Sequence, residues 1–224
     1  MCGRFAYFET EDLEERFPVT RKRGIRVGAS YNVAPGQIVP IIHSHNDEIV
    51  VDSMRWGYLP SWAKDQRMGY RMINARDDTV ETKPAWRGGL KHGRCLIPAN
   101  GFYEWKTEAG KKVKQPYFIR IPEMSTFAMA GICTVWLGPD GREIPTFAII
   151  TTSASREMED IHDRMPVIVS RHDERAWLSS ESSLEMIRSI MMPRHWTLEC
   201  IPVGHGVNSV VNNESTLISR VTPA

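Results

Sequence analysis

Short apolar or alternating runs, bounded by Gly, Pro, Asn or Asp, dominate the hydrophobic pattern of this chain and predict β-strands. Helix-like periodicity is confined to shorter segments, and the first of them has Thr10 as an N-cap before an acidic first turn. The expected strands span residues 4–7, 37–43, 48–56, 94–98, 101–106, 117–121, 127–135, 146–152, 166–170 and 197–202, and the expected helices span 10–16, 155–161, 171–179 and 183–190.

The expected strands outnumber the helices, and the two do not alternate regularly. This order favours an α+β fold: a single domain over residues 1–224, with a mostly antiparallel, barrel-like β core and short peripheral helices. A chain of 224 residues is within the range of one domain. It can bury roughly 70% of its unfolded surface without disulfides or metal ions. The polar, Gly-containing segments 109–114 and 138–141 are expected to be turns.

The composition of the chain limits how it could bind nucleic acid and gives no support for a metal site. The chain has 28 basic and 27 acidic residues, so nucleic-acid binding would depend on a local basic face rather than on overall charge. Its four cysteines include no CxxC pair, which indicates a reducing compartment and gives no support for a zinc site. Cys133 and Cys200 lie in apolar runs and are expected in the core. Without a signal peptide or a membrane-length apolar stretch, we expect a cytoplasmic protein, nucleoid-associated if bacterial or archaeal, that has no membrane partner. We also expect no metal and no cofactor.

The second residue is a cysteine, within the sequence MCGRF. A small residue after the initiator permits removal of Met1, which would leave Cys2 with a free amine of pKa about 7.7–8.0 and a thiol of pKa about 8.5. Such an amine condenses with an aldehyde to give an imine, and the thiol can close on the imine carbon to give a thiazolidine. A chain that keeps Met1 cannot form this ring and would have Met1 at the pocket mouth. The alternative is that position 2 has no chemical role.

Other segments carry polar residues where core packing does not require them. Asn74 and Arg76 alternate with apolar neighbours in MINAR, so a strand would place both on one face. Glu104 lies among three aromatic residues in GFYEW, a setting that raises a carboxyl pKa; the alternative is the solvent face of a half-buried strand. His162, in IHDRMP, can transfer protons near neutral pH, although a lone histidine is also compatible with a structural role.

Two loop segments leave similar choices open. Asn32 precedes a Pro-Gly pair in YNVAPG, which is typical of a turn-forming asparagine. Trp56 and Trp62 bracket the segment GYLPS. Aromatic side chains on such a loop can stack on unpaired bases, or they can belong to the core.

Together, MCGRF, YNVAPG, WGYLPSW, INAR, GFYEW and IHDRMP resemble the SOS-response-associated peptidase (SRAP) family, from residue 2 to about residue 210. Members of this family covalently trap abasic sites in single-stranded DNA. The resemblance implies an α+β domain in which Cys2, freed of Met1, forms a thiazolidine with the aldehyde of the abasic sugar. It also implies autoproteolytic removal of the N-terminal residue by a thiol peptidase activity. The implied pocket partners are Asn74, Glu104 and His162, and the implied DNA contacts are Arg4, Trp62, Arg76 and Arg164. We expect a monomer that binds single-stranded DNA.

Two other classes remain open. Amidohydrolases with an N-terminal nucleophile also begin Cys-Gly and use Cys2 with its own amine as base, although the other segments do not match a glutamine amidotransferase. The third interpretation is a DNA- or protein-binding module in which Cys2 is inert. Glutamine hydrolysis would identify the amidohydrolase, and a DNA adduct that survives denaturation would exclude the inert module.

Overall fold

The structure, a computed structural model, describes residues 2–8, 13–17, 19–22, 28–46, 48–108, 110 and 112–222. The strands are β1 (Phe5–Tyr7), β2 (Arg21–Lys22), β3 (Ser30–Val33), β4 (Ile38–His45), β5 (Glu48–Trp56), β6 (Asn74–Arg76), β7 (Arg94–Ala99), β8 (Gly101–Lys106), β9 (Gln115–Arg120), β10 (Phe127–Leu137), β11 (Glu143–Ser153), β12 (Arg164–Pro166), β13 (Ile168–Val169) and β14 (Glu199–Pro202). The helices are α1 (Leu13–Arg16), α2 (Arg87–His92), α3 (Glu174–Leu178) and α4 (Leu184–Met191), with 3-10 turns η1 (Gln66–Arg71), η2 (His205–Asn208) and η3 (Ser215–Ile218).

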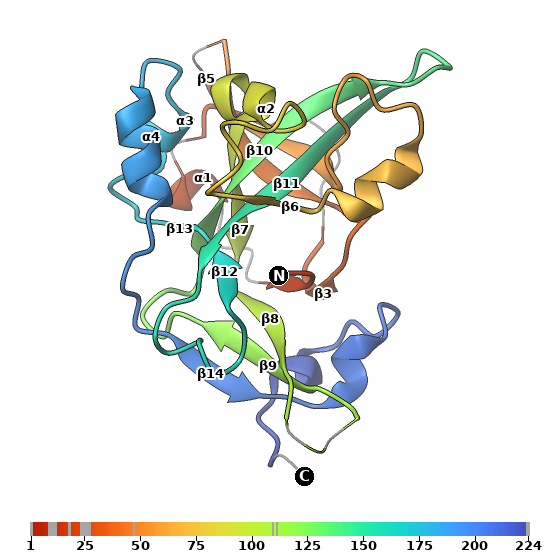
Figure 1. Cartoon of the computed structure of the whole chain (residues 1–224), viewed down its shortest axis with the longest axis vertical. Helices are drawn as coiled ribbons and strands as arrows, with labels where there is room; N and C mark the ends of the chain where they lie inside the picture. The colour runs from red at the N-terminus through yellow and green to blue at the C-terminus, as the bar shows by residue number, and fades with distance from the viewer. Residues whose placement is uncertain are drawn as a thin grey trace.

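Among the described residues, five strands form a closed barrel in the order β5-β4-β7-β10-β11 (Figure 1). Neighbours along this path are antiparallel, and the barrel closes where β11 pairs with β5 in parallel. Ile41 points into the inner core, whereas Ile42 packs in an outer core with Trp177 of α3 and Ile187 of α4. Burial on both faces explains why several strands are continuous apolar runs rather than alternating ones.

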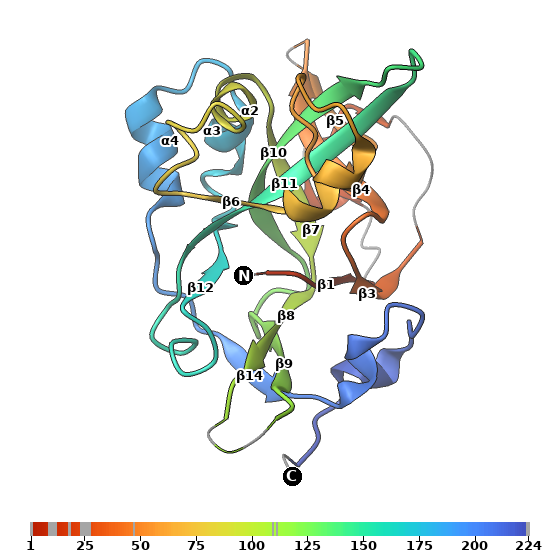
Figure 2. The ribbon, with the colours of Figure 1, turned by 45° about the vertical axis from the view of Figure 1, so that its right-hand side comes forward.

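A second sheet, β14-β9-β8-β1-β3, lies below the barrel (Figure 2). Its strand β1 is held between β8 and β3, with Phe5 opposite Phe102 on one side and Val33 on the other. Phe5 also packs edge-on against Trp56 of the barrel, with ring centroids 5.2 Å apart. The start of the chain is therefore fixed at the junction of the two sheets.

The backbone of the loop after β5 passes very close to η1. Gly57 has φ +135°, a conformation that favours glycine, and a Cβ there would lie 2.9 Å from the carbonyl oxygen of Gly69. A Cβ on Gly69 would in turn lie 2.7 Å from the carbonyl oxygen of Gly57. Glycine at both positions permits this close backbone contact. The contact fixes the start of the loop that carries Trp62.

The predicted fold class is confirmed: the protein is α+β and mostly strand, with a barrel core and short helices. The single-domain extent of 1–224 stays a prediction. The helix predicted over 155–161 is wrong, because this segment forms successive turns, while α2, β2 and β3 were not predicted. Residues 10–12, 109 and 111 of the predicted first helix and hairpin lie outside the described residues. None of the described helices is long and apolar enough to cross a bilayer.

Candidate active site around Cys2

Cys2 is completely buried, directly before β1. Its carbonyl oxygen accepts a hydrogen bond of 2.7 Å from the side-chain amide of Asn74. Its thiol donates to the carbonyl oxygen of Arg4 over 3.8 Å. Burial, and then the negative charge of Glu104, raise the pKa of this thiol well above its usual value. In the folded chain Cys2 is thus a protonated thiol that needs a base before it can act as a nucleophile.

Asn74 reaches Cys2 from the first position of β6. This short strand pairs in parallel with β11, where Asn74 lies opposite Ile149. Its neighbour Ala75 is buried in the outer core, so Asn74 and Arg76 share the other face, as the alternation in MINAR predicts. The side-chain oxygen of Asn74 is buried and has no hydrogen-bond partner among the described residues. Asn74 therefore orients Cys2 and keeps an acceptor for a further donor.

Glu104 lies in the middle of β8, and its side chain is only 3% exposed. Burial raises its pKa to about 7. One carboxyl oxygen lies 3.9 Å from Nε2 of His162. The expectation of a carboxyl with a raised pKa therefore fits this geometry, and the alternative of a solvent-facing glutamate is wrong.

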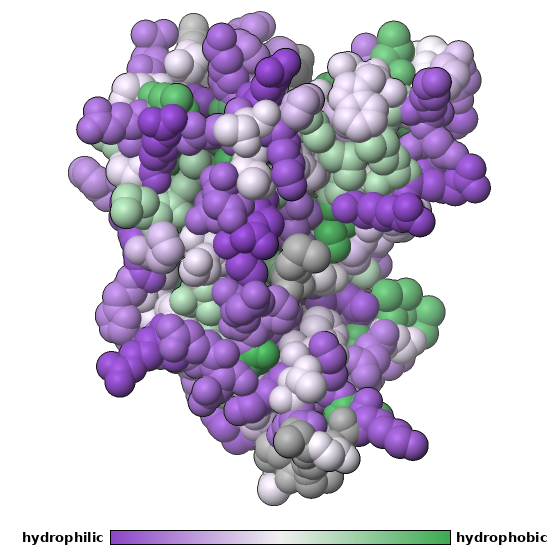
Figure 3. Space-filling model, viewed as in Figure 1, coloured by the Kyte–Doolittle hydropathy of each residue, from purple (hydrophilic) through white to green (hydrophobic). Residues whose placement is uncertain are grey.

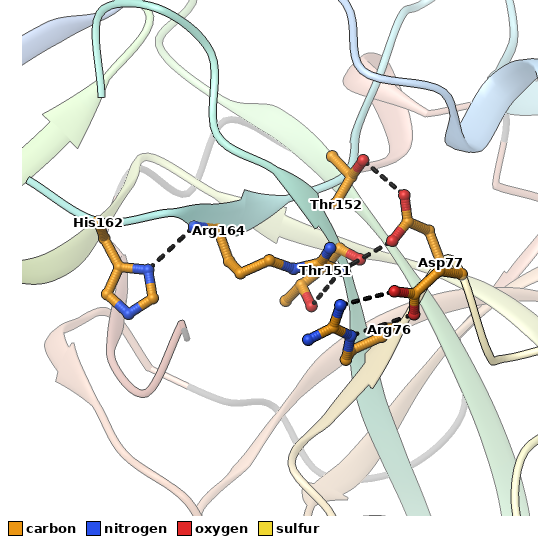
Figure 4. Close-up of polar contacts among 7 residues, drawn as sticks. Arg76, Asp77, Thr151, Thr152, His162 and Arg164 are labelled. Carbon is orange, nitrogen blue, oxygen red and sulfur yellow. Dashed lines mark hydrogen bonds and ion pairs between the residues drawn. The ribbon is translucent and has the colours of Figure 1, made fainter. Parts of the chain in front are cut away.

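His162 is partly buried, at 25% side-chain exposure, just before β12. Burial lowers the pKa of its imidazole, and the exposed Asp163 carboxylate, 2.9 Å from Nδ1, opposes this effect. The backbone N–H of Arg164 donates to Nδ1 over 3.0 Å (Figure 4). A neutral imidazole that accepts at Nδ1 carries its proton on Nε2. That proton faces the carboxyl group of Glu104.

The four predicted pocket residues are therefore brought together from four distant segments. Asn74 is hydrogen-bonded to Cys2, and Glu104 is close enough to raise the pKa of the Cys2 thiol and to approach His162. The pKa values of Glu104 and His162 are shifted toward each other, so a neutral acid and a neutral imidazole coexist near pH 7. Their catalytic roles stay predictions. Met1, expected at the pocket mouth, lies outside the described residues.

Two of the predicted DNA contacts are accessible. The side chain of Arg76 is 51% exposed and makes a bidentate ion pair with Asp78, with bonds of 2.6 and 3.1 Å. Trp62 is 55% exposed. Trp56, in contrast, is buried and donates its indole N–H to the carbonyl of Ile73. Only one of the two tryptophans that bracket the loop is therefore available for stacking.

Arg164 is held inside the protein, with a side chain that is 8% exposed. Its guanidinium donates to Asp77 over 2.8 Å, and to the backbone oxygen and hydroxyl of Thr151 (Figure 4). Thr152 donates its hydroxyl to the other carboxylate oxygen of Asp77 over 2.7 Å. In this conformation the guanidinium has an internal anion as its partner, and contact with DNA stays a prediction. No sequence pattern pointed to Asp77 beyond its place next to Arg76.

Arg4 also makes internal contacts. Its guanidinium donates to the side-chain oxygen of Asn32 and to the carbonyl of Val207, both over 2.7 Å. The amide of Asn32 donates to the carbonyls of Ser209 and Asn212. Asn32 is thus a buried residue that joins β3 to residues 207–212, rather than a simple turn former. A role of Arg4 in binding DNA stays a prediction.

The surface around these residues is mostly hydrophilic. The face seen in Figure 3 is hollowed on its right side, between the region of η1 above and the η2–η3 segment below. Within the described residues, no three His, Cys, Asp or Glu side chains are arranged to hold a metal ion.

A closed mixed barrel with a second sheet and a buried cysteine at position 2 defines an α+β protein whose site is built at its N-terminus. The model of the family SOS response associated peptidase (SRAP) matches residues 1–210, and the chain belongs to this family.

Curated relatives match nearly the whole chain. The abasic site processing protein YoqW of Bacillus subtilis is 40% identical over 97% of this chain and 99% of its own length. The abasic site processing protein YedK of Escherichia coli is 34% identical over 99% of this chain and 100% of its own. The abasic site processing protein HMCES of Pongo abelii is 30% identical over 95% of this chain and 73% of its own.

Solved structures show the same fold. A protein of Bacteroides thetaiotaomicron superposes with a TM-score of 0.79 at 28% identity, covering 96% of this chain and 92% of its own. A phage-related protein of Bordetella bronchiseptica superposes with a TM-score of 0.70 at 30% identity, covering 90% and 94%.

Proposed function

We propose that this protein processes abasic sites in single-stranded DNA, by forming a covalent crosslink between Cys2 and the aldehyde of the lesion. Family membership and the names of the relatives support the class of substrate. The observation that carries the proposal is the position of Cys2, which is hydrogen-bonded to Asn74 and lies in the electrostatic field of a carboxyl group with a raised pKa.

The first step is the opening of the sugar. An abasic deoxyribose is mostly a cyclic hemiacetal, so a group must move a proton between its hydroxyl and its ring oxygen before an aldehyde appears. His162 suits this task because burial lowers the pKa of its imidazole, which keeps a neutral ring able to accept a proton, and because the Arg164 backbone holds the ring. The free amine of Cys2, once Met1 is removed, then adds to the aldehyde carbon and gives a carbinolamine.

Glu104 completes the ring closure by giving up a proton and taking one back. Its carboxyl group protonates the carbinolamine hydroxyl, which leaves as water and produces an iminium ion. The resulting carboxylate takes the proton of the Cys2 thiol, and the thiolate attacks the iminium carbon. The products are a thiazolidine, one water molecule and a protonated Glu104. A carboxyl pKa of about 7 suits both halves of this cycle at neutral pH.

The same pocket can remove Met1 from its own chain. In this reaction the carboxylate form of Glu104 takes the proton of the Cys2 thiol, and the thiolate adds to the Met1 carbonyl carbon. Glu104 then returns the proton to the nitrogen of Cys2 as the C–N bond breaks and a thioester forms. Water then hydrolyses the thioester, which releases methionine and restores the thiol. We include this thiol autopeptidase activity in the proposal because it uses the same cysteine and the same carboxyl group.

We assign the substrate to single strands because two exposed side chains suit an unpaired strand. Trp62 offers an exposed aromatic face for an unpaired base. Arg76 offers an exposed guanidinium for the backbone. An abasic nucleotide lacks the base that would otherwise have to enter the pocket, so exclusion of normal nucleotides becomes a matter of size.

The test uses a single strand with one uracil, treated with uracil glycosylase and mixed with protein that lacks Met1. A one-to-one adduct should survive a denaturing gel and should be absent with untreated DNA. Cys2→Ala keeps the amine but loses the thiol, so its imine should be trapped only with borohydride. Cys200→Ala is the matched control and should crosslink like the wild type. A stable adduct with Cys2→Ala, formed without borohydride, would refute the mechanism.

A further inference from the structure

Two short strands, β6 and β12, bring Asn74 and His162 to the candidate site from opposite edges of β11. Thr151 of β11 is paired with Arg76 of β6 on one edge and with Pro166 of β12 on the other. Each of the two short strands has only three residues, so few backbone hydrogen bonds fix its position. Side-chain contacts that cross β11 therefore contribute to where Asn74 and His162 lie.

Arg164 makes such a contact, because its guanidinium reaches across β11 to Asp77, directly after β6 (Figure 4). Nη2 of Arg164 donates to Asp77 over 2.8 Å and also donates to the backbone oxygen of Thr151. The same oxygen accepts the backbone N–H of Asp77 over 2.9 Å. The hydroxyl of Thr152 donates to the second carboxylate oxygen over 2.7 Å. Asp77, with a side chain that is only 19% exposed, therefore ties the end of β6 to the start of β12.

The position of Arg164 decides which partner binds Nδ1 of His162. The backbone N–H of Arg164 donates to this nitrogen over 3.0 Å, and the Asp163 carboxylate lies 2.9 Å from it. The first contact requires an unprotonated Nδ1, whereas a hydrogen bond to Asp163 requires a proton there. With Arg164 in place, the proton of the neutral ring is on Nε2, which lies 3.9 Å from a carboxyl oxygen of Glu104.

We propose that Asp77 is a positioning residue of the crosslinking reaction. It holds the side chain of Arg164, so that the Arg164 backbone keeps His162 in the tautomer that carries its proton on Nε2. Without Asp77, the start of β12 loses its tie to β6, and Asp163 can take Nδ1–H as its donor instead. The inference rests on the proposed function, in which His162 opens the abasic sugar. Asp77 itself touches no reacting atom.

The first test reads the tautomer directly and needs no DNA. Nitrogen NMR of the His162 ring at about pH 8, where the imidazole is neutral, should show a protonated Nε2 in the wild type. The spectrum of His162→Gln assigns the signals. In Asp77→Ala a fraction of the molecules should carry the proton on Nδ1. An unchanged tautomer in Asp77→Ala would overturn the proposal, whether or not the protein forms an adduct with DNA.

The second test compares two aldehydes in single-turnover reactions of protein that lacks Met1. An abasic single strand has to be ring-opened, whereas propanal is already an open-chain aldehyde. Asp77→Ala should slow crosslinking to saturating abasic strand about tenfold, a part of what proton transfer contributes, and leave thiazolidine formation with propanal unchanged. Equal slowing with both aldehydes would show a general loss of structure and would refute the positioning role. A wild type that forms no DNA adduct would refute the proposed function instead.

The control variant is Glu174→Ala, which removes the partner of Arg16 in another ion pair of low exposure, between α1 and α3. It should lower the melting temperature like Asp77→Ala but leave both reaction rates unchanged. Thr152→Val removes only the hydroxyl that orients Asp77, and it replaces Asp77→Ala if that variant does not fold. It should slow the abasic reaction several-fold and spare propanal, and unchanged rates with both aldehydes would contradict the proposal.

A double-mutant cycle tests whether Asp77 acts through His162. If it does, Asp77→Ala should cause no further slowing in a protein that already carries His162→Gln, because the positioned group is gone. Effects of the two substitutions that multiply would show that Asp77 acts independently of His162 and would overturn the assigned role.

Discussion

In the proposed reaction Glu104 has to be protonated when water leaves the carbinolamine, so its pKa should limit crosslinking on the alkaline side. With a pKa of about 7, the fraction of protonated Glu104 falls as the pH rises above neutrality. The free amine of Cys2 has to be unprotonated, and its pKa of about 7.7–8.0 limits the reaction on the acid side. We therefore expect a bell-shaped profile of crosslinking rate with a maximum between about pH 7 and 8.

The variant Glu104→Gln should remove the alkaline limb of this profile and lower the maximal rate by about 100-fold or more. Quench-flow measurements from about pH 5.5 to 9 on an abasic single strand would show both effects, since this range spans the titration of both groups. His162→Gln serves as the comparison, because it should slow ring opening while the alkaline limb remains. An alkaline limb that persists in Glu104→Gln would show that another group supplies the proton.

The buried carboxyl group of Glu104 should also make stability depend on pH. Its folded-state pKa of about 7 exceeds the ordinary value of 4.5, so the folded chain holds a proton that the unfolded chain has lost. Its contribution to the free energy of unfolding is therefore complete below a pH of about 4.5 and is lost as the pH rises through about 7. Each pKa unit by which the folded and unfolded values differ corresponds to about 1.4 kcal/mol in the free energy of unfolding. Denaturant titrations should show a smaller loss of stability between about pH 5 and 8 for Glu104→Gln than for the wild type.

Two aspartates directly after β6 form ion pairs with arginines, Asp78 with the exposed Arg76 and Asp77 with the buried Arg164. Arg76 is paired with Asp78 at the surface, where solvent screening leaves such a pair little effect on stability. A phosphate has to displace Asp78 before Arg76 can bind it with both N–H groups. We predict that Asp78→Asn binds single-stranded DNA several-fold more tightly and unfolds at nearly the same temperature as the wild type. Fluorescence anisotropy and calorimetry would measure the two quantities.

Asp77 provides the matched control, because the neighbouring carboxylate is partly buried against Arg164. Asp77→Asn leaves a guanidinium of low exposure without its anion, which costs about 3–5 kcal/mol for a buried pair. This variant should therefore lower the melting temperature. Equal DNA affinities for Asp78→Asn and wild type would show that Asp78 does not compete with phosphate for Arg76.

At the scale of elements, the sequence predicted the strands whose positions are determined by the local pattern of apolar residues. Strands such as 48–56 and 101–106 follow from β-branched and aromatic runs, and both were predicted at their observed bounds. Helix α2 was missed because RGGLKH contains two glycines, which disfavour helices. The fold requires one of them, since a Cβ on Gly89 would lie 2.9 Å from the Tyr58 hydroxyl. The segment 155–161 has helical periodicity, but its chain turns so that Met158 is buried.

The candidate site was predictable only in part, because local sequence motifs do not reveal long-range contacts. Cys2, Asn74, Glu104 and His162 could be named because their motifs resemble those of the SRAP family. The internal partners of Arg4 and Arg164 could not, because ion pairs with Asp77 or hydrogen bonds to Asn32 depend on segments that only the folded chain brings together. Local sequence carries no signal of such long-range pairing.

At the scale of the whole molecule, the charge balance limits how the protein binds DNA. The net charge is only +1, so attraction must come from a few positioned cations. We predict that the logarithm of the single-strand affinity falls with the logarithm of salt concentration with a slope of about −2 to −4, which corresponds to a handful of phosphates. Binding to a continuous duplex should be weaker, because Trp62 needs an unpaired base. Equal affinities for both forms, measured by anisotropy, would contradict this prediction.

The enclosure of β1 between β3 and β8 sets an order of events during synthesis. Phe5 pairs with Phe102, so β1 cannot be enclosed until about 100 more residues have left the ribosome, which takes about 5–20 s at about 5–20 residues per second. An aminopeptidase can act on the start of the chain during this interval, whereas in the folded protein Cys2 is buried. Under the proposed autopeptidase activity, a chain that misses the interval would mature in its own pocket. Overexpression that exhausts the aminopeptidase should therefore yield two populations, one mature and one that matures slowly after folding.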